Sequence, residues 1–277
     1  MAGAAGRFRQ AGIEAPQREA RLLMSLASGL TTSQLILRGH LAAPDDLSES
    51  FDRMVRQREA RVPFQHIAGT TSFFGLDFIS DSRALVPRAD SEAVVEAALR
   101  LLPDGPGLEI ADLGTGSGCL LIALLVTRPD VSGTGVEADA AAASLAAENI
   151  AQHGLESRAD LAVQRWSEWS GWGSVDLIIS NPPYIRTEVI ASLDPEVRLH
   201  DPDAALDGGA DGLGAYRELA TLAEARLKPG ALVVFEIGYD QQEDVRAILS
   251  AAGLTNIGSA QDLGGSDRVV WARKPVG

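Results

Sequence analysis

Short apolar runs alternate with segments of helical periodicity through the last two thirds of the chain. The runs are rich in Val, Ile and Leu, which is typical of buried parallel strands. We predict strands at 108–113, 131–136, 161–163, 175–180 and 232–237, and helices at 119–127, 140–153, 213–228 and 241–252. This alternation predicts an α/β fold with a mostly parallel, doubly wound sheet. Two more runs, at 255–259 and 268–272, have no helix between them and predict an antiparallel strand at the sheet edge.

The amino-terminal part of the chain shows a different pattern. Apolar residues recur there at helical spacing, for example Phe51, Met54 and Val55, and predict a group of helices. Between residues 64 and 80 the pattern changes to that of a short β-hairpin. We therefore predict a helical domain (1–62), a β-hairpin connector (63–84) and an α/β domain (85–277).

Composition narrows the classes of protein that fit. The 277 residues carry a net charge of −14 and include one cysteine and four histidines. One cysteine excludes an internal disulfide, and the scattered histidines lack ligand spacing, so we predict no metal site. No apolar run approaches the ~20 residues of a membrane span, and the amino terminus does not resemble a signal peptide. We therefore expect a cytoplasmic protein without a membrane partner.

The acidic charge also argues against stable binding of nucleic acid, because binding to phosphate depends on Lys and Arg. One local exception is a group of four arginines, Arg53, Arg56, Arg58 and Arg61. A solvated helix face is the simpler interpretation of this group. A docking patch for a partner protein is the alternative.

The segment Ser180-Asn181-Pro182-Pro183-Tyr184 directly follows a predicted strand. Its two prolines lack an N–H group and fix φ, so the chain turns sharply where open α/β sheets place their ligand crevice. The side-chain carbonyl of Asn181 and the backbone carbonyl of Pro182 offer two acceptors, and Tyr184 adds a flat aromatic face. This arrangement suits a planar NH2 group, whose lone pair it would aim at an electrophile. A strand-ending turn without further function is the alternative.

A glycine-rich loop follows the predicted strand 108–113 and reads Asp112-Leu113-Gly114-Thr115-Gly116-Ser117-Gly118. Glycines let the backbone pass close to a ligand and expose N–H groups at a helix start. The next strand ends at Glu137, 19 residues after Gly118, where a carboxylate can accept hydrogen bonds from both hydroxyls of a ribose. Asp112 adds negative charge where a dinucleotide would place its pyrophosphate. S-adenosylmethionine, with its positively charged amino-acid tail, therefore fits this loop better than a dinucleotide.

Two further segments flank these motifs. In segment 85–92, Asp90 or Ser91 can cap the following helix, while Arg88 and Glu92 either belong to this start signal or face a site. Segment 186–212 contains prolines and a glycine-rich stretch but no clear periodicity. We expect it to be a structureless connection, of the kind that usually forms a lid or a binding loop.

Taken together, these segments resemble the bacterial protein-(glutamine-N5) methyltransferases that modify class 1 peptide chain release factors. The motifs that carry the resemblance occur in order along the chain. They are Pro63-Phe64-Gln65-His66-Ile67-Ala68-Gly69, Val86-Pro87-Arg88 with Asp90-Ser91-Glu92, the loop 112–118, Asn181-Pro182-Pro183-Tyr184-Ile185, Ala205-Leu206-Asp207-Gly208-Gly209 with Asp211-Gly212-Leu213, and Glu236-Ile237-Gly238.

The resemblance implies a class I S-adenosylmethionine-dependent methyltransferase fold of seven strands, the last one antiparallel, and an N-terminal helical domain that helps to hold the release factor. The reaction would transfer a methyl group to the side-chain amide nitrogen of glutamine in a Gly-Gly-Gln motif. The residues implied in catalysis are Asn181, Pro182 and Tyr184, and those implied in substrate binding are Asn181, Pro182, Pro183, Tyr184, Arg88 and Glu92. The cofactor residues are Asp112, Gly114, Thr115, Gly116, Gly118, Glu137, Asn181 and, by resemblance alone, Trp166.

Three alternatives stay open at this point. One is a glutamine methyltransferase that acts on a ribosomal protein. Another is a methyltransferase that acts on an exocyclic amine of a nucleic-acid base flipped out onto Tyr184, although the net charge of −14 argues against it. The third is a non-catalytic protein that binds S-adenosylmethionine, which would have no use for an intact Asn181 and Tyr184.

Overall fold

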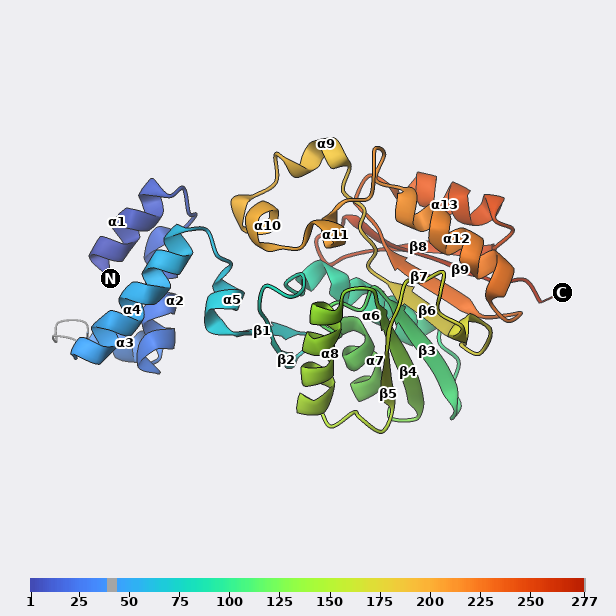
Figure 1. Cartoon of the computed structure of the whole chain (residues 1–277), viewed down its shortest axis with the longest axis horizontal. Coiled ribbons are helices and arrows are strands. Elements are labelled where there is room, and N and C mark those ends of the chain that lie inside the picture. The colour runs from blue at the N-terminus through green and yellow to red at the C-terminus, as the bar shows by residue number, and fades with distance from the viewer. Residues whose placement is uncertain (39–43, 277) are drawn as a thin grey trace. The chain divides into compact units, whose positions relative to one another are not determined.

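The computed structural model describes residues 1–38 and 44–276 (Figure 1). The chain divides into two compact units. One consists of Met1–Gly69 together with Asp194–His200, and the other of Thr70–Leu193 together with Asp201–Gly277. Each unit has a hydrophobic core of its own.

The first unit is helical, as predicted for the amino-terminal part of the chain. Its helices are α1 (Ala2–Gln10), α2 (Pro16–Ser28), α3 (Thr32–Arg38), α4 (Asp45–Glu59), α5 (Phe64–Ala68) and α10 (Pro195–His200). Residues of α1, α2 and α4 form its core, among them Phe8, Leu23, Phe51 and Val55. Gly29 ends α2 with a φ of +67°, a conformation that glycine adopts without steric cost.

Two of the four clustered arginines are not solvated. Arg58 is only 8% exposed, and its guanidinium group lies 2.8 Å from the carboxylates of both Glu19 and Glu196. Arg61 also donates to Glu196, through Nε at 2.8 Å. The prediction of a solvated helix face is therefore wrong for Arg58 and Arg61, whereas the other two arginines are exposed. Glu196 belongs to a distant stretch of the chain, so no local pattern could have revealed the pairing.

The predicted β-hairpin opens the second unit. Its strands β1 (Thr70–Phe73) and β2 (Leu76–Ile79) pair in antiparallel register. Phe74 and Gly75 connect them with φ values of +51° and +74°. Two consecutive positive φ angles give a two-residue turn whose twist matches that of the flanking strands.

A seven-stranded sheet with the order β5-β4-β3-β6-β7-β9-β8 forms the centre of the second unit. The strands are β3 (Leu108–Leu113), β4 (Val131–Glu137), β5 (Ala159–Val163), β6 (Leu177–Ser180), β7 (Leu232–Glu236), β8 (Thr255–Gln261) and β9 (Asp267–Arg273). Strands β3 to β7 are parallel, and β9 is antiparallel to both of its neighbours. This topology confirms the predicted fold class. The antiparallel strand does not lie at the edge, however, because β8 takes the edge and β9 returns between β8 and β7.

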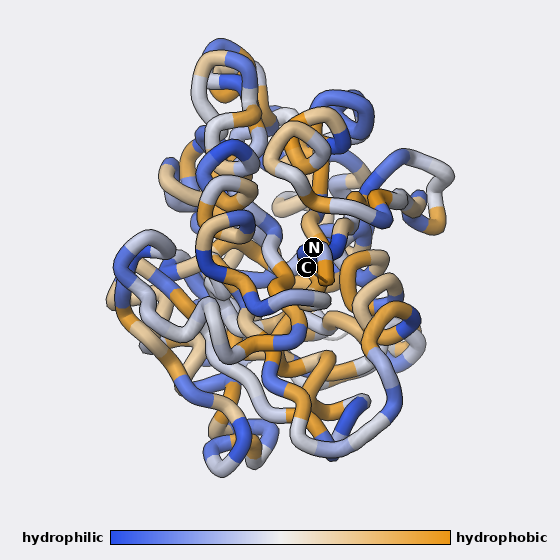
Figure 2. The backbone as a smooth tube through the Cα atoms, turned by 90° about the vertical axis from the view of Figure 1, so that its right-hand side faces the viewer, coloured by the Kyte–Doolittle hydropathy of each residue, from blue (hydrophilic) through white to orange (hydrophobic). Residues whose placement is uncertain are grey.

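Helices cover both faces of this sheet (Figure 1). They are α6 (Glu92–Leu101), α7 (Cys119–Thr127) and α8 (Ala140–Gln152) on one face, and α12 (Gly214–Arg226) and α13 (Gln242–Ala251) on the other. In β6, Leu177 and Ile179 join one core while Ile178 joins the other. Burial on both faces explains why the strands are continuous apolar runs. In Figure 2 hydrophobic and hydrophilic stretches alternate along the backbone. Helix α7 is an exception, because its residues 120–125 are all buried.

Segment 186–212 is not structureless, which corrects our expectation. It contains three short helices, α9 (Thr187–Ile190), α10 and α11 (Asp203–Leu206). Pro195 begins α10 and Pro202 directly precedes α11, positions where the fixed φ of proline favours a helix start. Helices of four to six residues are too short to produce a readable period. Within residues 1–38 and 44–276, no helix is both long enough and apolar enough to span a bilayer.

Candidate active site

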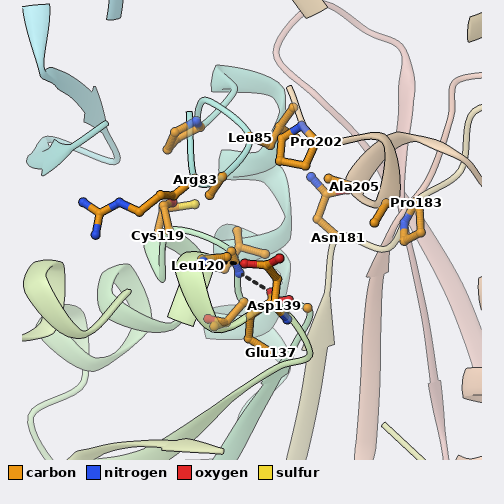
Figure 3. Close-up of a pocket in the computed structure, with 18 of the residues that line it drawn as sticks. Arg83, Leu85, Cys119, Leu120, Glu137, Asp139, Asn181, Pro183, Pro202 and Ala205 are labelled. Carbon is orange, nitrogen blue, oxygen red and sulfur yellow. Dashed lines mark hydrogen bonds between the residues drawn. The ribbon is translucent and has the colours of Figure 1, made fainter. Parts of the chain in front are cut away.

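A pocket of about 270 Å³ lies where β3, β4 and β6 end (Figure 3). Figure 3 shows Glu137 and Asp139 on one side of it and Asn181 and Pro183 on the other. The pocket gathers eight of the residues predicted for the site, namely Arg88, Gly114, Thr115, Gly116, Glu137, Trp166, Asn181 and Pro183. The sheet therefore brings together motifs that lie far apart in the sequence.

The glycine-rich loop forms one part of the pocket wall. Gly114, Gly116 and Gly118 have φ values of +75°, +54° and +84°, which other residues adopt only with strain. A Cβ atom on Gly114 would lie 3.6 Å from the indole ring of Trp166, so the loop and this ring are neighbours. Gly118 occupies the N-cap position of α7 and does not line the pocket. The loop thus presents its backbone directly to the pocket.

Asp112 lies at the end of β3 and is only 1% exposed. Its Oδ2 accepts a hydrogen bond from the Thr115 hydroxyl at 2.7 Å, while Oδ1 is buried without a hydrogen-bond partner among the described residues. Asp112 itself does not line the pocket, but Thr115 does. Burial raises the pKa of Asp112 to about 7. A buried acceptor that lacks a partner fits a cationic donor such as the α-amino group of S-adenosylmethionine.

Glu137 is held rigidly at the end of β4. Its Oε2 accepts a hydrogen bond from the backbone N–H of Gly116, and its Oε1 accepts one from Asp139, both at 3.0 Å (Figure 3). Each carboxylate oxygen retains a second acceptor position. The side chain can therefore accept two further hydrogen bonds from a ligand in the pocket, as two neighbouring hydroxyl groups would donate.

The Asn-Pro-Pro-Tyr turn begins where β6 ends. Asn181 and Pro183 line the pocket, whereas Pro182 is buried in the turn and Tyr184 packs against the core formed with α12 and α13. The Tyr184 hydroxyl donates to Oε1 of Glu236 at 3.3 Å. Burial raises the pKa of Tyr184 well above its usual range, so the phenol stays protonated and acts as a donor.

The segment 207–212 holds the backbone of this turn. Gly208 donates to the Ile185 carbonyl at 2.8 Å, and Gln241 donates from its side chain to the Tyr184 carbonyl at 3.0 Å. A Cβ atom on Gly212 would lie 2.4 Å from the same Tyr184 carbonyl oxygen. Only glycine permits this approach, which gives the glycine-rich stretch a structural reason.

The segment 88–92 divides its residues between the pocket and the scaffold. Arg88 lines the pocket and donates to Asp201 at 3.2 Å. Glu92 does not line it, and its carboxylate accepts from the backbone N–H of Phe74 at 2.8 Å. Ser91 occupies the N-cap position of α6 but makes no capping hydrogen bond, and its hydroxyl instead faces Asn181. The capping interpretation of Ser91 is therefore wrong.

Sequence reasoning missed several residues of the site. Asp139 lines the pocket and caps α8, with Oδ1 accepting from Ala141 and Ala142, a role that its position before an alanine-rich helix could have revealed. Glu236 lies buried beside Tyr184; the motif Glu236-Ile237-Gly238 belonged to the resemblance, but no role was predicted for Glu236. Arg83 lines the pocket without any sequence signal.

Residues 1–69 match the family described as "PrmC N-terminal domain", and residues 93–193 match the one described as "Methyltransferase small domain". The structure is also similar to the crystal structure of a methyltransferase from Pyrococcus furiosus, with a TM-score of 0.54 and 18% identity. That likeness covers 83% of this chain and all of the other, and it concerns the fold alone.

Curated relatives extend the similarity over almost the whole chain. The release factor glutamine methyltransferase of Caulobacter vibrioides is 40% identical over 268 residues, which are 97% of this chain and 93% of the relative. The enzyme of the same name from Rhodospirillum rubrum is 41% identical and covers 98% of this chain and 82% of its own. Such identity over nearly the full length of both proteins, on a methyltransferase fold, shows that this chain belongs to the release factor glutamine methyltransferase family.

Proposed function

We propose that this protein transfers a methyl group from S-adenosylmethionine to the side-chain amide nitrogen of glutamine in the Gly-Gly-Gln motif of class 1 peptide chain release factors. The observation that carries the proposal is one pocket with Glu137 on one side and Asn181 on the other, in a chain that belongs to this family. One side suits a nucleoside cofactor, and the other suits a planar amide.

The cofactor side consists of the glycine loop and Glu137, with Asp112 buried next to the loop through its hydrogen bond with Thr115. Asp112 accepts the α-amino group, the loop glycines pass beside the amino-acid tail, and Glu137 accepts the ribose hydroxyls. Trp166 lies against Gly114 and offers an aromatic surface to the adenine. When bound, S-adenosylmethionine supplies a methyl group on a positively charged sulfur, which keeps the electron pair of the broken carbon–sulfur bond.

The acceptor side consists of Asn181, Pro182 and Tyr184, with Pro183 and Arg88 as further substrate contacts, whereas Glu92 holds the backbone of Phe74. The Asn181 side-chain carbonyl and the Pro182 backbone carbonyl accept the two hydrogens of the glutamine amide. An amide nitrogen is a weak nucleophile because its lone pair is delocalised, so catalysis depends on aiming that lone pair. The nitrogen gives its lone pair to the new bond with carbon and afterwards releases one proton to water.

We further propose that residues 1–62 form a domain that helps to hold the release factor. Residues 63–84 connect this domain to residues 85–277, which catalyse the reaction in the cytoplasm, where translation terminates.

Two arginines that are exposed on α4, Arg53 and Arg56, allow a test of the docking role of residues 1–62. The double variant Arg53→Ala, Arg56→Ala should raise KM for the intact release factor several-fold and leave KM for a short Gly-Gly-Gln peptide unchanged. If the double variant and the wild type have the same KM for the intact release factor, these arginines do not belong to the docking surface.

Mass spectrometry of an unmodified release factor, incubated with the protein and S-adenosylmethionine, tests the reaction itself. We expect one added methyl group on the glutamine of the Gly-Gly-Gln peptide. Ribosomal protein, ribosomal RNA and duplex DNA are incubated in parallel. A methyl group on one of these, and none on the release factor, would overturn the substrate while keeping the chemistry of the turn.

A further inference from the structure

Asn149 is a fully buried asparagine of α8, a helix whose other buried residues are Ala, Leu and Ile. Asparagine favours a helix less than alanine does, and burying its amide costs free energy unless the polar atoms are hydrogen-bonded. The position therefore departs from local preference, as residues at functional sites often do. Asn149 does not line the pocket, so any effect on ligand binding must pass through another residue.

The side-chain amide of Asn149 pairs with the backbone of β2. Its Oδ1 accepts from the N–H of Ile79 at 2.7 Å, and its Nδ2 donates to the carbonyl of the same residue at 3.2 Å. Both backbone groups of Ile79 thus have partners of the kind that a neighbouring strand would supply. These bonds attach the hairpin to α8, beside which it lies (Figure 1).

The same Nδ2 group also reaches the glycine-rich loop, where it donates to the Ser117 carbonyl at 2.9 Å. The amide therefore faces an N–H group with its oxygen and two carbonyls with its nitrogen. A 180° flip would set donor against donor and acceptor against acceptor, so one orientation is selected. Asn149 joins the hairpin and the loop through one rigid group.

The loop needs such support because glycine leaves the backbone free to adopt many conformations. Ser117 lines the pocket and lies between Gly116 and Gly118, which both have a positive φ. The N–H of Gly116 is held by Glu137. Asn149 holds the carbonyl of the next residue from outside the pocket, so the backbone between these two contacts is fixed at both ends.

Attachment of the hairpin does not by itself explain the asparagine. Gln152, about one turn further along α8, donates to the Asp77 carbonyl at 2.6 Å, and the ring of His153 lies 2.9 Å from the same oxygen. Phe78, the residue between Asp77 and Ile79, is fully buried in the core. The hairpin is thus held to the helix at a second place, and the bond to Ser117 adds nothing to that attachment.

We propose that Asn149 is a positioning residue for S-adenosylmethionine: it fixes the Ser117 carbonyl and thereby holds the glycine-rich loop in the shape that receives the ligand. The inference rests on the proposed function for the identity of that ligand. It assigns a role in cofactor binding to a side chain that the cofactor does not touch.

A matched pair of variants tests this role. Asn149→Asp and Gln152→Glu each replace an amide by a carboxylate of the same shape, and each removes a donor to a carbonyl of the hairpin. Asn149→Asp also removes the donor to Ser117. At pH 8, which favours the carboxylate, we expect the Kd for S-adenosylmethionine to rise at least ten-fold in Asn149→Asp and to stay within two-fold of the wild type in Gln152→Glu. The added negative charge would by itself favour a cationic ligand, so weaker binding reports the lost hydrogen bond.

Calorimetry measures the Kd at a temperature at which circular dichroism shows both variants to be folded. Hydrogen exchange gives a second readout: relative to peptides from β7, the loop 112–118 should exchange at least ten-fold faster in Asn149→Asp than in the wild type. If Asn149→Asp does not fold, Asn149→Ala and Gln152→Ala are compared in the same way. Equal Kd values for the two variants, or unchanged exchange in the loop, would overturn the proposal. A wild-type protein that does not bind S-adenosylmethionine would instead refute the proposed function.

Discussion

Glu137 and Asn181 are fixed independently of each other. The Glu137 carboxylate accepts hydrogen bonds from the backbone N–H groups of Gly116 and Asp139. Asn181, on the other side of the pocket, donates from its side-chain amide to the Ser91 hydroxyl. Because these two sets of contacts share no residue, a change in one should leave the other in place. The functions of the two residues should therefore separate in experiments.

The first prediction concerns Asn181. We expect Asn181→Ala to lower kcat roughly 100- to 1,000-fold, the usual effect of removing one preorganised group that acts on the reacting atoms. Cofactor affinity should stay within a few-fold of the wild type, because Asp112 and Glu137 are untouched. Isothermal titration calorimetry measures the affinity and mass spectrometry measures the transfer. Loss of S-adenosylmethionine binding in this variant would show that the two sides of the pocket are not separate.

The second prediction concerns Glu137. We expect Glu137→Ala to weaken S-adenosylmethionine binding by about 1.5 to 3 kcal/mol, the range for hydrogen bonds to a charged group. Glu156→Ala is the matched control, since Glu156 is an exposed carboxylate that does not line the pocket. Calorimetry should give an unchanged Kd for the control. An unchanged Kd for Glu137→Ala as well would remove this residue from the cofactor site.

At the scale of elements, the catalytic turn depends on a second segment that packs against it. The strand β6 delivers the turn, and the segment 207–212 then fixes its backbone through the hydrogen bond from Gly208 to Ile185 and the close approach of Gly212. Neither segment would hold this shape alone, because two consecutive prolines leave the turn with few N–H groups of its own.

The third prediction uses two glycines of that segment. Gly212 and Gly209 both have a positive φ, +74° and +89°, so alanine at either position brings a similar backbone strain. Only Gly212→Ala would also place a Cβ atom 2.4 Å from the Tyr184 carbonyl, whereas the space beside Gly209 is open. We expect kcat at least ten-fold lower in Gly212→Ala than in Gly209→Ala, with similar Kd for S-adenosylmethionine. Equal activities would mean that the close approach does not shape the turn.

At the scale of the whole molecule, the helical unit is made from two separate pieces of the chain. Residues 194–200 belong to it, although they lie within the segment that follows the catalytic turn. Glu196 joins the pieces through Arg58 and Arg61, all three with side chains less than one fifth exposed. A deletion of residues 1–62 would therefore leave Glu196 without its partners, so point variants report on this unit more cleanly than a truncation.

The fourth prediction follows from the charge of Glu196. Burial alone would raise its pKa, but the hydrogen bonds from Arg61 and Arg58 outweigh burial and lower it. A carboxyl group whose pKa is lowered on folding stabilises the folded state above its unfolded pKa, and this stabilisation is lost as the pH falls through the folded value. We expect Glu196→Gln to destabilise α4 and α10 by about 1 to 3 kcal/mol at pH 7 and by much less once the pH is below the lowered pKa of Glu196.

Hydrogen exchange of peptides from α4 and α10, corrected for intrinsic rates at each pH, measures this local stability. Glu188→Gln is the control, because Glu188 is exposed on α9. A constant difference between the wild type and Glu196→Gln at both pH values would contradict the assigned charge effect.

The sequence by itself determined the order of strands and helices, the glycine loop with Glu137, and the Asn-Pro-Pro-Tyr turn. These features depend on local causes: apolar runs long enough for buried strands, glycines that permit a positive φ, and prolines that stop a strand. The same local causes place their residues at the ends of parallel strands, where they meet in one pocket.

Some side chains have a partner far away along the chain. For these, only the tertiary structure decided which of two local interpretations is correct. Ser91 had a good local reason to cap α6, yet it contacts Asn181, 90 positions away along the chain. Arg58 had the spacing of a solvated residue, yet Glu196 buries it. Glu92 had equal reasons to face a site or a helix start, and it holds the hairpin turn at Phe74. In each case the partner comes from a distant part of the chain, so no pattern within a short window of the sequence contains the contact.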